Sequence, residues 1–309
     1  MNASTCENQW QVRVRVPATT ANLGPGFDCM GLALNLWNEA CFTRAGEGIR
    51  LINYGEGPNI PTDERNLIIQ AMRFFCDLRG LTLPRGLLIR CHNQIPLSSG
   101  LGSSAAAVLT GLLGAAQLLN SPLDEKEALD LAARMEGHAD NAAAALFGGL
   151  VLVAAGKGSW LVQRIEVPPI QAAVVLPAFD LPTHAARAVL PGEVSLSDAT
   201  FNMGRALLVV EALRNGSLDL LRRAMDDRLH TPYRLPLIPG AQAALEAAYQ
   251  AGASAVTISG AGPSLIAFSA ADARQVSEAM VSAFKRAGVT ARAFLLQTTS
   301  SGAAVETRS

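Results

Sequence analysis

The chain has little charge and no excess of either sign. Only 17% of its 309 residues are charged, and the formal net charge is −1. A nucleic-acid partner would require a basic face, and the sequence has neither an arginine-rich nor an aromatic run. Half of the residues are hydrophobic, which argues against disorder. The composition predicts a globular protein of one large or two moderate domains, without a nucleic-acid partner.

Patterns for metal clusters, disulfides and export are also missing. The five cysteines are widely scattered without a Cys-x-x-Cys pair, and the four histidines lack metal-site spacing. Such an odd, scattered set is expected of reduced thiols in a cytoplasmic protein. Residues 1–10 are polar and contain no apolar signal core, so secretion is not expected.

One stretch without Asp, Glu, Lys or Arg, residues 91–123, is long enough to suggest a membrane span. It contains Asn93, Gln94, Pro96, a serine–glycine cluster and Gln117, and its helical part is rich in alanine rather than leucine. A buried helix behind a loop explains this stretch better, so no membrane partner is expected.

The most informative segment is this serine–glycine cluster, Pro96-Leu-Ser-Ser-Gly-Leu-Gly-Ser-Ser-Ala-Ala-Ala107. Residues 86–92 before it predict a strand, and residues 105–119 after it predict a helix with one apolar face. Glycines allow close backbone approach to an anion, and the free N–H groups of a first helical turn point towards it. The segment therefore predicts a phosphate-binding loop, with a structural turn that caps a core helix as the alternative.

The loop lacks the Gly-Lys-Ser/Thr ending of a P-loop, and none of the three lysines lies near it. Its pattern, Pro-x-x-x-Gly-Leu-Gly-Ser-Ser-Ala, resembles the phosphate loop of the GHMP small-molecule kinases. The resemblance implies ATP as co-substrate. It implies ATP contacts from Asn66, near adenine, and from the loop residues Pro96, Leu97, Ser98, Ser99, Gly100, Leu101, Gly102, Ser103, Ser104, Ala105 and Ala106.

Further segments resemble the homoserine kinase branch of this family. Pro17-Ala-Thr-Thr-Ala-Asn-Leu-Gly-Pro-Gly-Phe-Asp28 is similar to the N-terminal signature of that branch. The resemblance implies that Asn22 and Asp28 contact the substrate, with Asp28 as a partner for its ammonium group. A turn-forming role for Asn22 alone is the alternative.

Glu136-Gly-His-Ala-Asp-Asn141 resembles a second motif of the branch, although fewer residues than usual separate Glu136 from His138. The resemblance implies that Glu136 binds Mg²⁺ with Ser104, Ser103 being the other candidate. Carboxylate and hydroxyl oxygens, completed by phosphates and water, suit Mg²⁺. His138, Asp140 and Asn141 would line the L-homoserine pocket, and Glu136, Ser104 and Asn141 would serve the catalytic step.

Thr183-His-Ala-Ala-Arg187 and Arg234 resemble the positions at which the family binds the carboxylate of the amino acid. A planar guanidinium can bind a carboxylate through two hydrogen bonds. The glycine loop Ser259-Gly-Ala-Gly-Pro-Ser264 resembles the third family motif and is expected to pack against the phosphate loop. Surface charge is the alternative role for each arginine alone.

Apolar periodicity and the positions of Gly and Pro predict the elements. They predict strands over residues 11–16, 31–44, 86–92, 148–153, 172–176, 255–259, 264–269 and 291–297, and helices over 66–78, 105–119, 123–135, 198–214, 218–229, 240–251 and 272–287. Pro17 is expected to end the first strand. The later elements follow a β-α-β-β-α-β order, which is ferredoxin-like.

The fold class expected is α+β, in the two-domain GHMP kinase architecture. Residues 1–165 would form a nucleotide-binding domain that resembles ribosomal protein S5 domain 2, and residues 166–309 a ferredoxin-like domain. The expected activity is ATP-dependent phosphorylation of L-homoserine in threonine biosynthesis, by a cytoplasmic protein for which the family alone suggests a homodimer. The alternatives are a kinase for another alcohol such as mevalonate, and a non-catalytic ligand sensor on the same fold.

Overall fold

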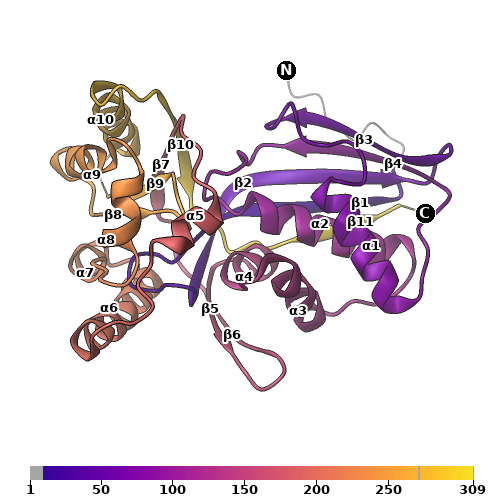
Figure 1. Ribbon diagram of the computed structural model, residues 1–309, viewed down its shortest axis with the longest axis horizontal. Helices are drawn as coiled ribbons and strands as arrows, with labels where there is room; N and C mark the ends of the chain where they lie inside the picture. Colours follow the sequence, from indigo (N-terminus) through magenta and orange to yellow (C-terminus); the bar gives the residue numbers. More distant parts are fainter. Residues whose placement is uncertain (1–9, 271, 309) are drawn as a thin grey trace.

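The computed structural model describes residues 10–270 and 272–308, and two β-sheets with their helices form its two lobes (Figure 1). We call the lobe around the larger sheet the N-domain and the other the C-domain. Residues 1–9, which include most of the segment expected to lack a signal core, lie outside the described residues. No helix among the described residues has the length and hydropathy needed to cross a membrane.

The N-domain sheet has seven strands, five of them in the order β11-β1-β2-β4-β3, while β5 pairs with β2 and β6 pairs with β5. All the pairs are antiparallel except β3 with β4. The strands are β1 (Val12–Ala21), β2 (Met30–Thr43), β3 (Gly48–Gly55), β4 (Gly86–Asn93), β5 (Leu150–Ala155), β6 (Trp160–Ile165) and β11 (Ala304–Thr307).

The alternating valines of β1, Val12, Val14 and Val16, are buried, and they join a core that reaches from the sheet to the helices of the N-domain. The central helix α2 is buried on most of its sides, since it packs against β1, β2, α1, α3 and α4. The four helices are α1 (Leu67–Arg79), α2 (Ser103–Leu118), α3 (Glu125–Glu136) and α4 (Asp140–Phe147). Burial explains why the long stretch without charged residues is apolar, and no membrane is needed.

The C-domain sheet is antiparallel with the order β10-β7-β9-β8. Numbered within the domain this order is 4-1-3-2, which confirms the ferredoxin-like arrangement. Its strands are β7 (Gln171–Pro177), β8 (Ala255–Ile258), β9 (Leu265–Phe268) and β10 (Ala291–Gln297). Its helices are α5 (Thr183–Ala188), α6 (Leu196–Asn215), α7 (Leu218–Ala224), α8 (Thr231–Arg234), the 3₁₀ turn η1 (Leu235–Leu237), α9 (Ala241–Gln250) and α10 (Ala273–Arg286).

The chain returns to the N-domain at its end. After β10, the last described strand, β11, pairs antiparallel with β1, from Val12 opposite Thr307 to Arg15 opposite Ala304. The domain boundary expected at residue 165 therefore assigns β11 to the C-domain, although β11 belongs to the N-domain sheet.

Two predicted boundaries are wrong for local reasons. Strand β1 continues past Pro17 to Ala21, because a register shift between Pro17 and Ala18 accommodates the proline. Helix α7 ends at Ala224 rather than near Leu229, because the Asp227 carboxylate accepts hydrogen bonds from the N–H groups of Leu229, His230 and Thr231.

Cys29, Cys76 and Cys91 are free, but Cys41 forms a disulfide, so the prediction of uniformly reduced cysteines is wrong at that position.

Candidate functional site

The phosphate-loop candidate lies where the N-domain meets the C-domain. Gly102 precedes α2 with φ +70°, and no side chain caps the helix. The N–H groups of Ser103, Ser104 and Ala105 are those that a helix leaves without internal partners, and the first turn carries no acidic residue. The uncapped, uncompensated positive end of a 16-residue helix is an anion-binding arrangement.

The second glycine loop, residues 259–264, packs against this loop, as expected. Ser259 donates a hydrogen bond from Oγ to the Gly100 carbonyl at 2.8 Å, and the Ser264 N–H donates to the Ser99 carbonyl at 3.3 Å. A Cβ on Gly100 would lie 2.2 Å from the Ser259 carbonyl oxygen, so this contact needs glycine. Direct backbone contact between the loops fixes the two domains relative to each other at the site.

An interdomain cavity of about 200 Å³ opens beside the helix α2 N-terminus. Both domains contribute to it: the N-domain supplies acids, amides and serines, and the C-domain supplies arginines. The predicted site residues among its lining are Asn22, Asp28, Ser98, Ser99, Gly100, Gly102, Ser103, Ser104, Glu136, His138, Asp140, Asn141, Thr183, Arg187 and Arg234.

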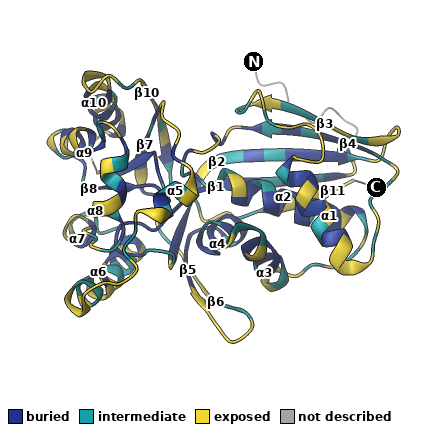
Figure 2. Cartoon of the chain, viewed as in Figure 1, coloured by how far each residue is buried: buried dark blue, intermediate teal, exposed yellow. Residues whose placement is uncertain are grey.

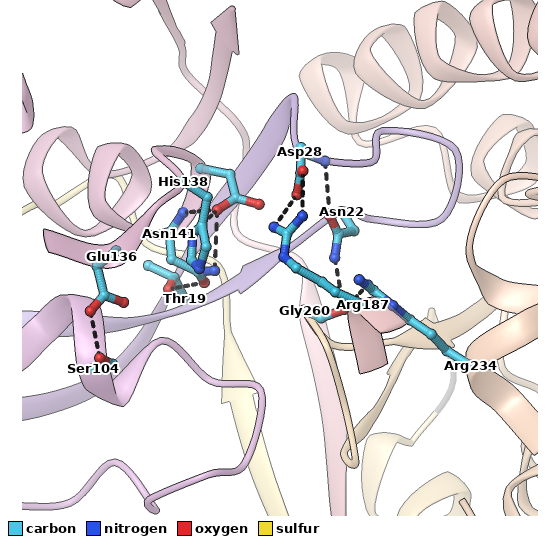
Figure 3. Close-up of polar contacts among 11 residues, drawn as sticks. Thr19, Asn22, Asp28, Ser104, Glu136, His138, Asn141, Arg187, Arg234 and Gly260 are labelled. Atoms are coloured by element: carbon cyan, nitrogen blue, oxygen red, sulfur yellow. Dashed lines mark hydrogen bonds and ion pairs between the residues drawn. The ribbon is translucent and has the colours of Figure 1, made fainter. Parts of the chain in front are cut away.

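Asp28 and Arg187 form a bidentate ion pair on one wall of this cavity, with N–O distances of 2.8 and 2.9 Å (Figure 3). The hydrogen bond to Asp28 raises the pKa of Arg187. Arg234 lies beside Arg187, and both guanidinium groups lie near the ring of Phe27, at 5.0 and 5.6 Å from its centroid. The carboxylate and the two arginines therefore form one cluster of opposite charges.

Arg234 is only 1% exposed. Its Nε donates to the Ala186 carbonyl at 3.0 Å, and Nη1 donates to the Gly260 carbonyl at 3.3 Å. Burial, followed by the neighbouring charge of Arg187, lowers the pKa of Arg234 from that of a free arginine. Asn22 donates to the same Gly260 carbonyl at 2.7 Å and accepts from the Asp28 N–H at 3.0 Å. Asn22 thus shapes the turn and lies in the cavity at once.

A second cluster lies between these arginines and α2 (Figure 3). Asp140 is buried and accepts hydrogen bonds from His138 Nδ1 at 3.0 Å and from the Asn141 backbone N–H at 2.7 Å. The hydrogen bond to Asp140 raises the pKa of His138 against the opposing effect of burial. Thr19 Oγ1 donates to Asn141 Oδ1 at 2.8 Å, so the orientation of the Asn141 amide is fixed from both ends.

Ser104 Oγ donates to Glu136 Oε1 at 2.5 Å at the edge of the cavity. Burial raises the pKa of Glu136, against the opposing effect of the Ser104 hydrogen bond. Helix α3 ends at Glu136, and Gly137 in the left-handed conformation, φ +80°, turns the chain towards His138. The short spacing between Glu136 and His138 therefore places both side chains at the site.

A separate N-domain cavity of about 290 Å³ shares Ser98, Ser103 and Ser104 with the interdomain cavity. It is lined by residues of β2, α1 and α2 and by Asn66, Leu97 and Ile60. Asn66 caps α1, accepts from the Ile68 N–H and donates to the Pro61 carbonyl, so both ends of its amide already have partners. The shared serines connect the two cavities at the helix N-terminus.

The described residues contain no group of three or more His, Cys, Asp or Glu side chains arranged to bind a metal. The Ser104–Glu136 pair beside the anion-binding helix end remains, and it offers two oxygen ligands.

Comparison with protein families matches two segments of the chain. Residues 66–149 match the N-terminal domain of the GHMP kinases, and residues 209–286 match the C-terminal domain of the same kinases. The chain belongs to the GHMP kinases. Among curated relatives of this GHMP kinase, the homoserine kinase of Moorella thermoacetica is 45% identical over 89% of this chain and 93% of its own length.

A homoserine kinase of a Synechococcus species is 42% identical over 96% of this chain and 98% of its own length. Among solved structures, homoserine kinase from Cytophaga hutchinsonii superposes with a TM-score of 0.84 at 31% identity, covering 99% of this chain and all of that one. A mevalonate kinase from L. major superposes with a TM-score of 0.68 at 17% identity over 97% of both chains, which shows a common fold only.

Not every predicted ATP-contact residue of this GHMP kinase faces a cavity. Leu101, Ala105 and Ala106 are buried and, like Pro96, do not line either cavity. The N–H of Leu101 donates to Ser99 Oγ, and the N–H of Ala106 donates to the Gly102 carbonyl. Leu101 and Ala106 therefore shape the loop, and their N–H groups are already used within the protein.

Contributors to the site that were not predicted individually include Thr19, Phe27 and Gly260. Thr19 and Phe27 lie inside the Pro17–Asp28 motif, and Gly260 lies inside the 259–264 loop, so the motifs contained the signal. His230, which contacts the Asn22–Asp28 loop from the C-domain, and Asp227, which bonds the backbone around His230, had no comparable signal of their own.

Proposed function

We propose that this kinase transfers the γ-phosphoryl group of ATP to the side-chain hydroxyl of L-homoserine, giving O-phospho-L-homoserine in threonine biosynthesis. The observation that carries the proposal is the Asp28–Arg187 ion pair, with Arg234 beside it, in a cavity that opens onto the α2 N-terminus. This cavity offers partners for an ammonium and a carboxylate group next to an anion site. The two curated homoserine kinases named above, 42% and 45% identical, support the same activity.

The ion pair between Asp28 and Arg187 explains how a zwitterion is selected. The ammonium group of the amino acid binds Asp28, and its carboxylate binds Arg187 and Arg234. Binding therefore replaces the Asp28–Arg187 ion pair by two ion pairs with the substrate, one at Asp28 and one at the arginines. A substrate with a carboxylate but no ammonium group would leave the Asp28 carboxylate without its cationic partner. Leaving a partly buried charge unpaired is costly, so such substrates are disfavoured.

The nucleotide would occupy the N-domain cavity, with its phosphates at the α2 N-terminus. The walls of that cavity supply apolar contacts for a base through Ile60, Leu67 and Leu97. The glycines and serines of the loop, together with the first-turn N–H groups, bind the phosphates. Asn66 orders the wall by capping α1, and its amide is already engaged with Pro61 and Ile68.

The Ser104–Glu136 pair fits Mg²⁺. Two adjacent oxygens, one of them a carboxylate, match a metal that binds one or two protein ligands and completes its shell with phosphates and water. Mg²⁺ would neutralise the charge that develops on the phosphates. Ser103 also lines both cavities, so its hydroxyl is the alternative ligand.

The chemical step proceeds without a dedicated carboxylate base: the hydroxyl oxygen bonds to the γ-phosphorus as its bond to ADP breaks, and the hydroxyl proton passes to an oxygen of the transferred phosphoryl group. Asn141 Oδ1 already accepts from Thr19 and retains a second lone pair, which accepts a hydrogen bond from the substrate hydroxyl and aligns it. Phosphoryl transfer has a loose transition state that requires mainly alignment and charge neutralisation. Asp140 is occupied by His138 and Asn141 and acts by orienting these two side chains.

A kinase for mevalonate is the nearest alternative. Such a site has no use for an ammonium partner like Asp28 and favours a lysine near the phosphates. Neither of the two cavities is lined by a lysine among the described residues. A non-catalytic ligand sensor is the other alternative, and the joined cavities and the Ser104–Glu136 pair argue for catalysis instead.

The test is a coupled ADP-release assay with L-homoserine, mevalonate, galactose and shikimate as parallel acceptors. L-Homoserine should give the largest kcat/KM of the four. Faster turnover of mevalonate would overturn the proposal, and ADP release from none of the acceptors would favour the sensor. D-Homoserine is a matched control, because it carries the same groups in the wrong arrangement.

We also propose that the enzyme is cytoplasmic, in agreement with its use of ATP. We further propose that it forms a homodimer through α6. Much of α6 is exposed or partly exposed (Figure 2), and its exposed apolar residues include Leu196 (81%), Met203 (59%) and Leu207 (72%). A Cβ added to Gly204 would meet no atom within 4 Å, so an approaching helix could come close there. Analytical ultracentrifugation should find a dimer that Leu207→Glu dissociates and Leu161→Glu, at an exposed position of β6, does not.

A further inference from the structure

The segment from Asp227 to Arg234 connects the Asn22–Asp28 loop to the second arginine of the site. The buried Asp227 carboxylate accepts from Asn202 Nδ2 at 2.7 Å and from the N–H groups of Leu229 and His230 at 2.9 and 3.0 Å. These bonds form the turn from which α8 begins, and Arg234 is the last residue of α8. The position of Arg234 therefore depends on Asp227.

His230 makes the contact to the loop. Its ring is completely buried, and Nε2 donates to the Gly24 carbonyl at 2.7 Å. The ring also packs against Phe27, with 5.2 Å between the ring centroids. Phe27 is the ring near which Arg187 and Arg234 lie, so His230 contacts the loop at its backbone and at its aromatic residue.

The loop needs such support. Asn22, Leu23 and Asp28 have positive φ angles of 70°, 46° and 55°, and Gly24 has one of 68°. Residues with side chains seldom adopt this conformation, and they keep it only where the surroundings hold them. Asn22 is held by Gly260 at one end of the loop, while His230 and Met225 contact Gly24 in its middle.

We propose that Asp227 and His230 are positioning residues for the acceptor site. They do not line the interdomain cavity, and they set where the Asp28 carboxylate stands relative to Arg187 and Arg234. His230 acts as a neutral ring with its proton on Nε2, because Gly24 offers an acceptor there and Nδ1 has no hydrogen-bond partner among the described residues. Burial lowers the pKa of His230, in agreement with the neutral form.

The inference rests on the proposed amino-acid site, but its test can be read separately. His230→Phe keeps a ring against Phe27 and loses the donor to Gly24. His230→Gln keeps a donor that reaches the Nε2 position. We expect His230→Phe to raise the acceptor KM at least tenfold with the ATP KM within twofold of wild type. His230→Gln should restore the acceptor KM to within about threefold.

Phe284→Leu, a core substitution in α10 away from the site, is the control for general loss of stability. A merely structural role for His230 would change the melting temperature of both variants and leave the ratio of the two KM values unchanged. An unchanged acceptor KM in His230→Phe, or an equal rise in the ATP KM, would overturn the inference. So would a Gln variant no better than the Phe variant.

Two provisions keep the test decisive. If His230→Phe is recovered only as aggregate, His230→Asn, which is too short to reach Gly24, replaces it with the same expected result. The acceptor used is whichever of the four panel compounds the wild type prefers. Failure of L-homoserine in the wild type would then count against the proposed function, while the KM ratios of the variants alone decide the role of His230.

Discussion

Arg187 and Arg234 carry the same charge into the cavity but differ in what else they support. Arg187 is partly exposed and pairs with Asp28, whereas Arg234 is buried and holds two backbone carbonyls. Loss of a charge-assisted hydrogen bond costs about 1.5–3 kcal/mol, so Arg187→Ala should raise the homoserine KM about 10- to 100-fold. The ATP KM should stay within about twofold.

Arg234→Ala should raise the homoserine KM similarly and also lower the melting temperature, because it leaves the Ala186 and Gly260 carbonyls with fewer donors. Steady-state kinetics and thermal denaturation of both variants check this difference. Arg223→Ala, an exposed arginine paired with Asp219 on α7, is the control. A rise in the ATP KM without one in the homoserine KM would contradict the assignment.

Glu136 tests the metal site through its pH dependence. Metal binding needs the carboxylate, and burial raises the pKa of Glu136 above that of a free glutamate. As the pH falls through this raised pKa, the group is protonated and more Mg²⁺ should be required for half-maximal activity. Glu136→Gln should raise the Mg²⁺ requirement at every pH, lower kcat and remove this acidic dependence.

Titration of activity against Mg²⁺ at fixed ATP, repeated between about pH 5 and pH 8, measures the effect. Glu127→Gln, at the other end of α3, is the matched control. If the Mg²⁺ curve of Glu136→Gln coincides with that of the wild type, the metal is bound elsewhere.

Asp140 distinguishes alignment from general-base catalysis. A general base contributes about 10²- to 10⁴-fold to the rate, whereas loss of alignment should raise the homoserine KM and lower kcat by no more than about tenfold. Asp140→Asn removes the charge and keeps most of the shape. A fall in kcat of about 10³-fold in a folded variant, with loss of the acidic limb of the pH profile, would make Asp140 the base.

The same variant has a second readout in His138. Because the bond to Asp140 raises the pKa of His138, protonated His138 stabilises the folded protein below the ordinary histidine pKa of about 6.5. This contribution is lost as the pH rises through the raised folded-state pKa. Asp140→Asn should lower the pKa of His138, which NMR titration of the ring measures.

At the scale of elements, Gly102 decides whether α2 can begin at the cavity. A Cβ there would lie 2.0 Å from Thr19 Oγ1, and φ is +70°. Gly80 has a similar φ of +62° at the end of α1 with no atom within 4 Å of its Cβ position. Gly80→Ala should therefore cost only the backbone strain, about 1 kcal/mol in the free energy of unfolding.

Gly102→Ala should cost more than Gly80→Ala in urea denaturation and should also raise the ATP KM at least about tenfold, since the displaced loop no longer presents its N–H groups to the phosphates. Equal losses of stability with an unchanged ATP KM in both variants would show that the clash with Thr19 has no functional consequence.

Local chemistry explains which elements the sequence could predict. Helix α1 was predictable at both ends, because Asn66 caps its start and Gly80 ends it in the left-handed conformation. Strands β6 and β11 were not, because their residues are almost all exposed and show no alternation of apolar and polar positions. Helix α7 was predicted too long, since nothing local showed that Asp227 would bind the next N–H groups.

The site was predictable as a set of residues but not as an arrangement. Motif resemblance predicted Asp28, Arg187 and Arg234, which all line one cavity. Asp28 and Arg187 are 159 positions apart in the sequence. Only the folded chain brings them together, and no local pattern near either residue predicts that they pair. The contacts of Phe27 likewise depend on the C-domain, which supplies His230, Arg187 and Arg234 around its ring.

For the whole molecule, several contacts join the two domains near the site. Besides the contact of the two glycine loops, Arg292 on β10 forms a bidentate ion pair with Glu56 of the N-domain, at 2.6 and 2.7 Å. The Thr299 N–H donates to the Ala33 carbonyl where the chain passes from β10 back to the N-domain. The acceptor cavity is lined by residues of both domains, so a bound acceptor adds further contacts between the two domains.

These contacts predict that the protein unfolds as one unit and that each substrate stabilises all of it. Differential scanning calorimetry should show one transition, which L-homoserine at about 100 times its Kd raises by roughly 4 °C, since such binding adds about 2.7 kcal/mol. Arg187→Ala at the same L-homoserine concentration should reduce the shift to about 2 °C or less, because its affinity is about 10- to 100-fold weaker, and should keep the shift with ATP. Two transitions in the wild type, only one of which responds to L-homoserine, would mean that the acceptor binds within one domain and that the interdomain site is wrong.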